Sequence, residues 1–177
     1  MRGSAQNTGW YCSVKRYVIV LIAVVAIVGL DQLTKYMVCQ SLPLHHQKEV
    51  VKNFFHIVHV RNPGIAFGLF TQAGARYRIP MLILVSAVAV FIICYFLYQI
   101  KDGSRLQSVC FTLLLGGAIG NLIDRFRMGE VIDFLDIHWY SAFHWPAFNV
   151  ADSAITVGIV LLGIDTVLGM KRKKIEQ

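Results

Sequence analysis

Aspartate side chains gather in one stretch of this otherwise apolar sequence, residues 116–153. Half of the chain's ten acidic residues lie there, among them Asp124, Asp133, Asp136 and Asp152. A carboxylate held against apolar surroundings is hard to ionise, and a second carboxylate nearby raises one pKa of the pair further. Two such acids can share one proton, so that one activates water while the other polarises a carbonyl and assists the leaving amine. The stretch favours hydrolysis by two of these four aspartates.

Two of the four aspartates also have simple structural explanations. Asp152 follows Asn149 by three residues, a spacing typical of a helix start at which Asn149 is the N-cap and Asp152 is favoured by the helix dipole. Asp124 comes at the end of an apolar run, where the helix dipole disfavours an anion. It needs a cation beside it, such as Arg125, and a structural salt bridge is its expected role.

Asp133 and Asp136 belong to residues 131–137, a segment with the composition of a strand. Strand alternation places the two carboxylates on opposite faces, each among apolar neighbours. One of them must therefore point toward apolar surroundings. The pattern alone does not say which.

Other catalytic and metal-binding patterns are missing from the sequence. It contains no G-x-S-x-G, no zincin motif and no suitably placed Cys/His pair. His56 and His59 are three residues apart, which on a strand sends them to opposite faces. The adjacent His45 and His46 are a weak metal signal on their own. We therefore expect neither a metal nor a cofactor.

The composition is that of a membrane protein. Apolar residues make up 56% of the 177 residues and charged residues only 15%. The mean hydropathy of +0.57 lies well outside the range of soluble domains. The net charge of +7 comes from Lys and Arg beside apolar runs, which fits orientation in an anionic membrane and not nucleic-acid binding. The length leaves room for a single domain, residues 1–177.

A helix needs about 20 apolar residues to cross a bilayer. Four segments come close, namely residues 17–38, 79–98, 106–122 and 153–170. The first resembles a cleaved signal peptide, but it lacks an Ala-x-Ala-like site and continues into Asp31, so we expect a retained span. An even number of spans puts both termini on the same side of the membrane.

Basic residues set the expected orientation of the spans. Segments 1–16, 99–105 and 171–177 hold nine Lys or Arg in 30 positions, whereas 39–78 and 123–151 hold seven in 69. By the positive-inside rule, both termini lie in the cytoplasm. Residues 39–78 and 123–152 are then the periplasmic segments, and the acid-rich stretch lies at the periplasmic face.

Polar residues near the outer ends of the spans are further candidates. Asp31 and Lys35 are four residues apart on one helix face. An ionisable residue inside a span is a functional candidate, but a structural or lipid-contacting role is the simpler expectation for this pair. Gly116, Gly117 and Gly120 are small residues that would let neighbouring helices approach closely.

The first outer loop is long enough to hold structure of its own. Residues 53–60 are rich in aromatic and β-branched side chains, as expected of a strand. Pro63 and Gly64 then mark a turn, and residues 66–70 fit a second strand or a segment on the membrane surface. Asn62 fits a turn-forming role just before that turn, or its amide holds a substrate backbone.

Five short motifs occur in order along this four-span chain: residues 31–35 (DQLTK), 62–68 (NPGIAFG), 116–125 (GGAIGNLIDR), 131–134 (VIDF) and 148–153 (FNVADS). Together they resemble the bacterial lipoprotein signal peptidases, or type II signal peptidases. The resemblance implies a mainly α-helical membrane protein with four transmembrane helices, a small extracytoplasmic β-cradle and a short periplasmic helix. It also implies an aspartic endopeptidase that removes signal peptides from diacylglyceryl-modified prolipoproteins, cleaving on the amino side of the lipidated Cys.

By this resemblance, Asp133 and Asp152 are the catalytic aspartates and activate water by general acid and base catalysis. The resemblance assigns a supporting or substrate-binding role to eight further residues: Asn62, Gly64, Asn121, Arg125, Asn149, Asp31, Lys35 and Asp124. The implied partners are prolipoprotein substrates, membrane phospholipid and the peptide antibiotic globomycin. The implied location is the bacterial inner membrane, with a monomeric chain.

Two other classes of function remain open at this point. An ion-coupled transporter or channel component would place acids near the middle of the bilayer, facing a pore. Only Asp165 lies deep in a span, and it is six residues before Lys171, closer to the cytoplasmic edge. A non-catalytic membrane scaffold is the other alternative, and accumulation of precursor after deletion would exclude it.

Overall fold

The computed structural model describes residues 5–64, 75–100, 105–140 and 143–175. Within these ranges the chain forms the following helices and strands: α1 (Ala5–Ser41), β1 (Gln47–Val51), β2 (Phe55–Asn62), α2 (Ala75–Gln99), α3 (Arg105–Met128), β3 (Val131–Trp139), β4 (Phe143–Phe148) and α4 (Val150–Ile175).

Each helix contains a stretch long and apolar enough to cross a membrane: Lys15–Ser41, Arg76–Gln99, Arg105–Met128 and Val150–Met170. Large apolar side chains face outward on these helices, such as Phe91, which is 81% exposed. A bilayer covers such surfaces, whereas water would make their exposure costly. The predicted fold class, a mainly helical four-span membrane protein with a small sheet, is confirmed. The helices extend beyond the predicted segments because hydropathy marks the part in lipid and not the end of the helical hydrogen bonding.

The four strands form one antiparallel sheet in the order β1-β2-β3-β4. Strand β2 begins within the segment predicted at 53–60 and extends past it to Asn62, and β3 contains the segment predicted at 131–137. The register places Asp133 opposite Val60 and Asp136 opposite His56. The segment predicted at 66–70 lies outside the described residues, and the part of the chain that the structure describes contains no short periplasmic helix.

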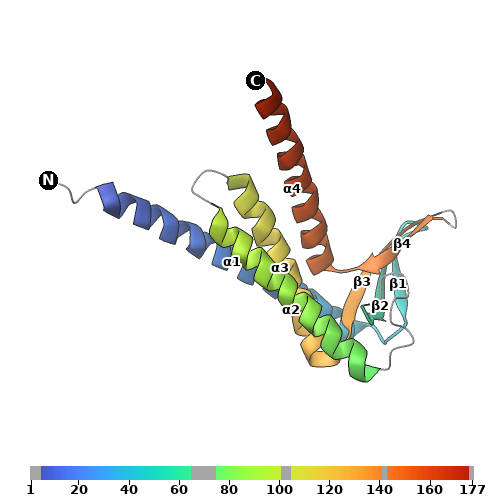
Figure 1. Cartoon of the computed structure of the whole chain (residues 1–177). Helices are drawn as coiled ribbons and strands as arrows, with labels where there is room; N and C mark the ends of the chain where they lie inside the picture. Colours follow the sequence, from blue (N-terminus) through green and yellow to red (C-terminus); the bar gives the residue numbers. More distant parts are fainter. Residues whose placement is uncertain (1–4, 65–74, 101–104, 141–142, 176–177) are drawn as a thin grey trace.

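The sheet lies at one end of the helix bundle (Figure 1). Helices α1 and α3 end near it, and α2 and α4 begin near it, whereas α1 begins and α4 ends at the far side of the bundle. Side chains from helix ends and from β2 and β3 therefore meet at one junction.

Helix α3 packs against each of the other three helices. A Cβ added to Gly116 would lie 2.8 Å from Ile27 of α1, and one added to Gly117 would overlap the carbonyl oxygen of Ala151 in α4. The close approach predicted from the small residues is confirmed. It brings α1 and α4 onto the turns of α3 that precede the junction.

Candidate active site

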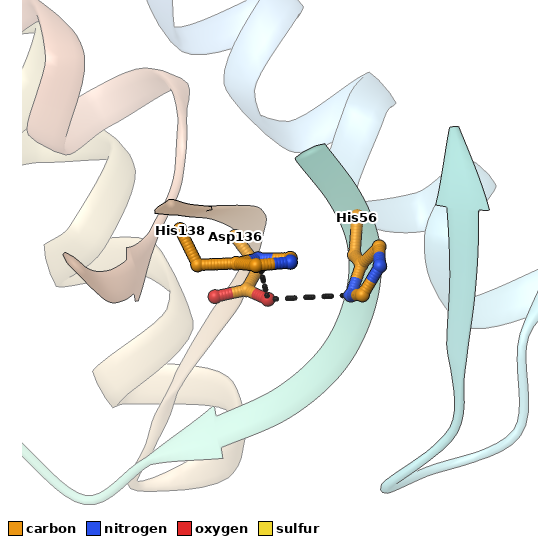
Figure 2. A group of neighbouring side chains, drawn as sticks. All are labelled: His56, Asp136 and His138. Atoms are coloured by element: carbon orange, nitrogen blue, oxygen red, sulfur yellow. Dashed lines mark ion pairs between the residues drawn. The ribbon is translucent and has the colours of Figure 1, made fainter. Parts of the chain in front are cut away.

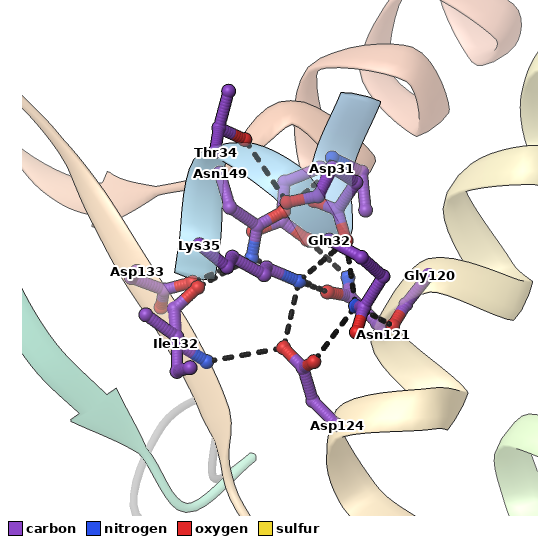
Figure 3. Close-up of polar contacts among 12 residues, drawn as sticks. Asp31, Gln32, Thr34, Lys35, Gly120, Asn121, Asp124, Ile132, Asp133 and Asn149 are labelled. Atoms are coloured by element: carbon purple, nitrogen blue, oxygen red, sulfur yellow. Dashed lines mark hydrogen bonds and ion pairs between the residues drawn. The ribbon is translucent and has the colours of Figure 1, made fainter. Parts of the chain in front are cut away.

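A buried lysine of α1 neutralises two carboxylates. Lys35 Nζ lies 2.8 Å from Asp31 Oδ2 on the same helix and 2.7 Å from Asp124 Oδ2 on α3. It also donates a hydrogen bond of 3.0 Å to Asn121 Oδ1. Figure 3 shows the Lys35 ammonium group among these three partners. Since an ammonium group has three donors, all of those of Lys35 are in use, two of them on carboxylates.

The carboxylate of Asp124 is bound by groups from α1 and β3. Besides Lys35, its carboxylate accepts hydrogen bonds from Gln32 Nε2 at 2.9 Å and from the backbone N–H of Ile132 at 3.3 Å. The cation beside Asp124 is thus Lys35, and the ion pair with Arg125 that the sequence suggested is not formed among the described residues. Sequence reasoning missed Gln32, although a polar side chain inside an apolar span was a usable signal.

Asp133 faces amide groups instead of cations. Its Oδ2 accepts a hydrogen bond of 2.9 Å from Asn62 Nδ2, and its Oδ1 accepts one of 2.7 Å from Asn149 Nδ2. Burial raises the pKa of Asp133 to about 6, the charge of Asp152 adds to this rise, and the two amide donors oppose it. Asp133 therefore exchanges its proton far closer to neutral pH than an ordinary aspartate does.

The backbone holds Asn62 in the orientation that Asp133 needs. Gly64 donates its N–H to Asn62 Oδ1 at 2.9 Å, so Nδ2 is left to point at the carboxylate. The φ angle of Gly64 is +78°, and an added Cβ would lie 2.9 Å from Leu82 Cδ1. Glycine adopts such a left-handed conformation without the steric cost that other residues have. The chain therefore turns at Gly64, where a turn was predicted, and this turn orients the Asn62 amide toward Asp133.

Asp152 lies in the first turn of α4 and also faces an amide. Its Oδ1 accepts a hydrogen bond of 2.8 Å from Asn121 Nδ2. Asn121 presents Nδ2 to this carboxylate because its Oδ1 accepts a hydrogen bond from Lys35. Asn149 Nδ2 donates to the same oxygen at 3.2 Å, so Lys35 and Asn149 together set which end of the Asn121 amide meets Asp152.

Two side chains cap the N-terminus of α4. Asn149 Oδ1 accepts a hydrogen bond of 2.8 Å from the N–H of Asp152, which confirms the expected N-cap. Asp31 Oδ1 accepts one of 2.9 Å from the N–H of Ala151. Because Asn149 also donates to Asp133, this one side chain connects the aspartate of β3 with the helix that carries Asp152.

Arg125 lies within electrostatic range of Asp152, Asp124 and Asp133. Its Nε is buried, and no group among the described residues accepts a hydrogen bond from it. The residues predicted for the site therefore gather at one junction of helix ends and sheet. Two carboxylates there, Asp133 and Asp152, take part in no ion pair within the described ranges, and they are close enough to interact. Such a pair is able to share one proton.

The fourth candidate, Asp136, lies on the other face of β3, three residues from Asp133. Its neighbours are imidazoles and not the amides of the junction. The sequence offered no suitably placed Cys/His pair as a catalytic set, and in the structure Cys39 Sγ lies 3.4 Å from His59 Nε2. His59 Nδ1 is 2.8 Å from the carbonyl oxygen of Leu42. The pair joins the end of α1 to β2, two elements whose proximity the sequence alone did not reveal.

A four-span helical bundle with carboxylates and amide donors at one end defines a membrane-embedded enzyme of the aspartic hydrolase class. The family model described as Signal peptidase (SPase) II matches residues 22–168. The chain belongs to this family and is a signal peptidase II, an aspartic protease that processes lipoproteins.

Relatives and solved structures agree with this assignment. A lipoprotein signal peptidase of Syntrophotalea carbinolica is 51% identical over 144 residues, which cover 81% of this chain and 88% of that protein. A lipoprotein signal peptidase of Geobacter sulfurreducens is 45% identical over 144 residues, which again cover 81% of this chain and 88% of that protein. A bacterial membrane enzyme solved by the in meso method at 2.3 Å superposes with a TM-score of 0.75 at 31% identity, covering 88% of this chain and 91% of the other.

Proposed function

We propose that this enzyme cleaves diacylglyceryl-modified prolipoproteins on the amino side of the lipidated Cys, with Asp133 and Asp152 as the catalytic pair. The main support for the proposal is that the Lys35 cation contacts two of the four aspartates at the junction and forms no ion pair with the other two among the described residues. Lys35 is bound to Asp31 and Asp124, whereas Asp133 and Asp152 accept hydrogen bonds from neutral amides. A carboxylate without a fixed cation is free to take up and release a proton.

In the proposed mechanism, the two carboxyl groups hold one proton between them. The ionised carboxylate removes a proton from a water molecule, and the resulting hydroxide attacks the carbonyl carbon of the scissile peptide bond. The protonated carboxyl donates to the carbonyl oxygen, and the tetrahedral intermediate then collapses as the leaving amine is protonated. No covalent enzyme intermediate forms. Because the acids titrate as a coupled pair, their apparent pKa values belong to both.

The surrounding polar groups hold the two carboxylates in place for this mechanism. Asn62 and Asn149 fix both oxygens of Asp133, and Asn121 fixes one oxygen of Asp152. The buried Nε–H of Arg125 has no hydrogen-bond acceptor among the described residues. We propose that it donates a hydrogen bond to the backbone of a bound substrate or of the inhibitor globomycin. A buried donor gains most from a ligand that supplies the missing acceptor.

The proposal includes an orientation in the bacterial inner membrane. Both termini lie in the cytoplasm, and the junction lies at the periplasmic face, where the lipidated Cys of a precursor meets the membrane surface. The uneven density of basic residues supports this orientation. The enzyme acts as a monomer, and phospholipid covers its apolar outer surface.

The test is cleavage of a diacylated precursor by the purified chain in detergent, with and without globomycin. Asp133→Asn and Asp152→Asn should each lower kcat/KM by about 10³-fold or more. Asp165→Asn is the matched control, since Asp165 is also in α4 but bonds to Gln107. Full cleavage by either the Asp133 or the Asp152 variant would refute the assignment of the pair.

A further inference from the structure

A second polar cluster lies on the face of the sheet opposite to Asp133, and the proposed mechanism does not use it. Along the register, Glu49 of β1 pairs with His56 of β2, and His56 pairs with Asp136 of β3. His138 follows Asp136 by two residues on the same face. It pairs with His144 of β4. Four strands therefore contribute imidazoles and carboxylates to one surface.

Three of these side chains converge. His56 Nδ1 lies 3.7 Å from Asp136 Oδ2, and His138 Nδ1 lies 3.5 Å from the same oxygen. One ligand atom from each of the three residues lies within 4.8 Å of the others. Figure 2 shows the three side chains together, with dashed lines from the Asp136 carboxylate to both imidazoles.

Hydrogen bonding does not account for this arrangement. Asp136 is 5% exposed, and both its Oδ1 and the Nδ1 of His138 are buried without a hydrogen-bond partner among the described residues. His144 Nε2 lies 2.7 Å from Asp136 Oδ1 without forming a hydrogen bond to it. A buried polar atom without a partner is costly. A further group bound beside the cluster would supply the missing partners.

We propose that His56, Asp136 and His138 bind a divalent transition-metal ion, for which Zn²⁺ is the best fit. Imidazole nitrogen and carboxylate oxygen are the ligand types that Zn²⁺ takes in proteins. Tetrahedral coordination with metal–ligand bonds of about 2.0–2.1 Å places neighbouring ligand atoms about 3.3 Å apart. The separations of 3.5 and 3.7 Å are close to that value. Small side-chain rotations bring the three atoms onto one ion.

Two further residues complete the site. The other ring nitrogen of His56, Nε2, lies 3.6 Å from Glu49 Oε1, which is the placement of the carboxylate that orients a metal-bound imidazole. His144 is 65% exposed and lies beside Asp136, so it is free to turn and supply the fourth ligand. The ion joins β2 to β3, and through His144 to β4, behind the strand that carries Asp133.

The spacing argument from the sequence concerned only His56 and His59, which contact different partners in the structure. It missed the cluster because His56 and Asp136 are 80 positions apart and meet only through the β2–β3 register.

The test uses the purified, tag-free chain in detergent after removal of metal with a chelator. Titration with Zn²⁺ followed by calorimetry should give one ion per chain with a Kd below about 10 µM. Co²⁺ should give the intense visible absorption of tetrahedral coordination. The thermal unfolding temperature should rise with added Zn²⁺, because the ion binds the folded state. Absence of saturable one-to-one binding would overturn the proposal.

Variants locate the ion. His138→Gln should weaken Zn²⁺ binding by more than about 100-fold and abolish the Co²⁺ band, and Glu49→Gln should weaken binding by about tenfold. If His138→Gln does not fold, His56→Gln on β2 is measured in its place. His46→Gln, an exposed histidine outside the cluster, is the matched control and should bind as the parent does. Equal affinity of the parent and both cluster variants, or loss of binding in the His46 variant, would place the ion elsewhere and refute the site.

Discussion

Two pairs of aspartates meet at the same junction and have opposite surroundings. Asp31 and Asp124 share the ammonium group of Lys35 at 2.8 and 2.7 Å. Asp133 and Asp152 accept hydrogen bonds from the amides of asparagines. The first pair is bound to a fixed cation, whereas the second pair forms no ion pair among the described residues.

The placement of one cation separates Asp31 and Asp124, here called the structural pair, from Asp133 and Asp152, which we propose are catalytic and call the reactive pair. Lys35 also accounts for the orientation of Asn121, whose Oδ1 it holds while Nδ2 meets Asp152. The structural pair is thus a support for the reactive one. Asp31 serves in the same way, because it caps the first turn of α4 at Ala151.

Removing the cation of Lys35 should have the largest effect on stability. Lys35→Met leaves Asp31 and Asp124 buried without a partner charge. We expect the free energy of unfolding to fall by about 3–5 kcal/mol, measured by thermal unfolding in detergent with circular dichroism. Adding Asp124→Asn should recover part of the loss, since it removes one of the unpaired charges.

Lys15→Met is the matched control, because Lys15 lies on the same helix and is exposed. Its effect on the free energy of unfolding should stay within about 0.5 kcal/mol. If Lys35→Met proved as stable as the parent, the two pairs of acids would not differ in their need for a cation.

Much of this arrangement could be predicted from the sequence. Hydropathy indicates the four spans, and the spacing of Asn149 and Asp152 predicts the N-cap that the structure contains. The small residues of α3 predict its close contacts with α1 and α4. These features depend on local periodicity, which sequence preserves.

Contacts between distant segments could not be predicted in this way. Periodicity does not show that Lys35 reaches Asp124, 89 positions further on, in place of the adjacent Arg125. Nor does it show which face of β3 meets the helices, because Asp133 and Asp136 have similar apolar neighbours in sequence. The sheet register and the helix packing decide both, and they are properties of the whole fold.

The pH dependence of stability tests the reactive pair directly. The carboxyl of Asp133 has an ordinary pKa of 3.8 in the unfolded chain and a pKa of about 6 in the fold. As the pH rises from about 4 to 6, the unfolded chain loses this proton first, so the folded state loses stability over that window. A pKa difference of about two units corresponds to about 3 kcal/mol.

Asp133→Asn lacks this titration and provides the reference. The free energy of unfolding of the parent, minus that of the variant, should fall between about pH 4 and pH 6 and stay constant above. A difference that instead rose with pH would mean that the fold stabilises the ionised form of Asp133.

Removing an amide donor should have a smaller effect on the reactive pair. Asn62→Ala deletes a hydrogen bond that favours ionised Asp133, so the pKa of Asp133 should rise above about 6. We expect kcat/KM at neutral pH to fall by about 10–100-fold, the worth of a hydrogen bond to a charged group. The pH profile of cleavage is the readout, and its Asp133 limb should move to higher pH. A uniform loss at every pH would assign Asn62 a purely structural role.

The smallest expected effect comes from the turn that aims Asn62. Gly64→Ala forces a side chain into φ +78° and against Leu82, at a cost of about 1–2 kcal/mol in stability. Gly129→Ala is matched to it, with φ +74° and a Cβ that would lie 2.6 Å from Ile79 Cδ1. Both variants should unfold at lower temperature, but only Gly64→Ala should lower kcat/KM, by about tenfold, because it displaces the amide beside Asp133. Equal activity of the two variants would show that the orientation of Asn62 does not depend on this turn.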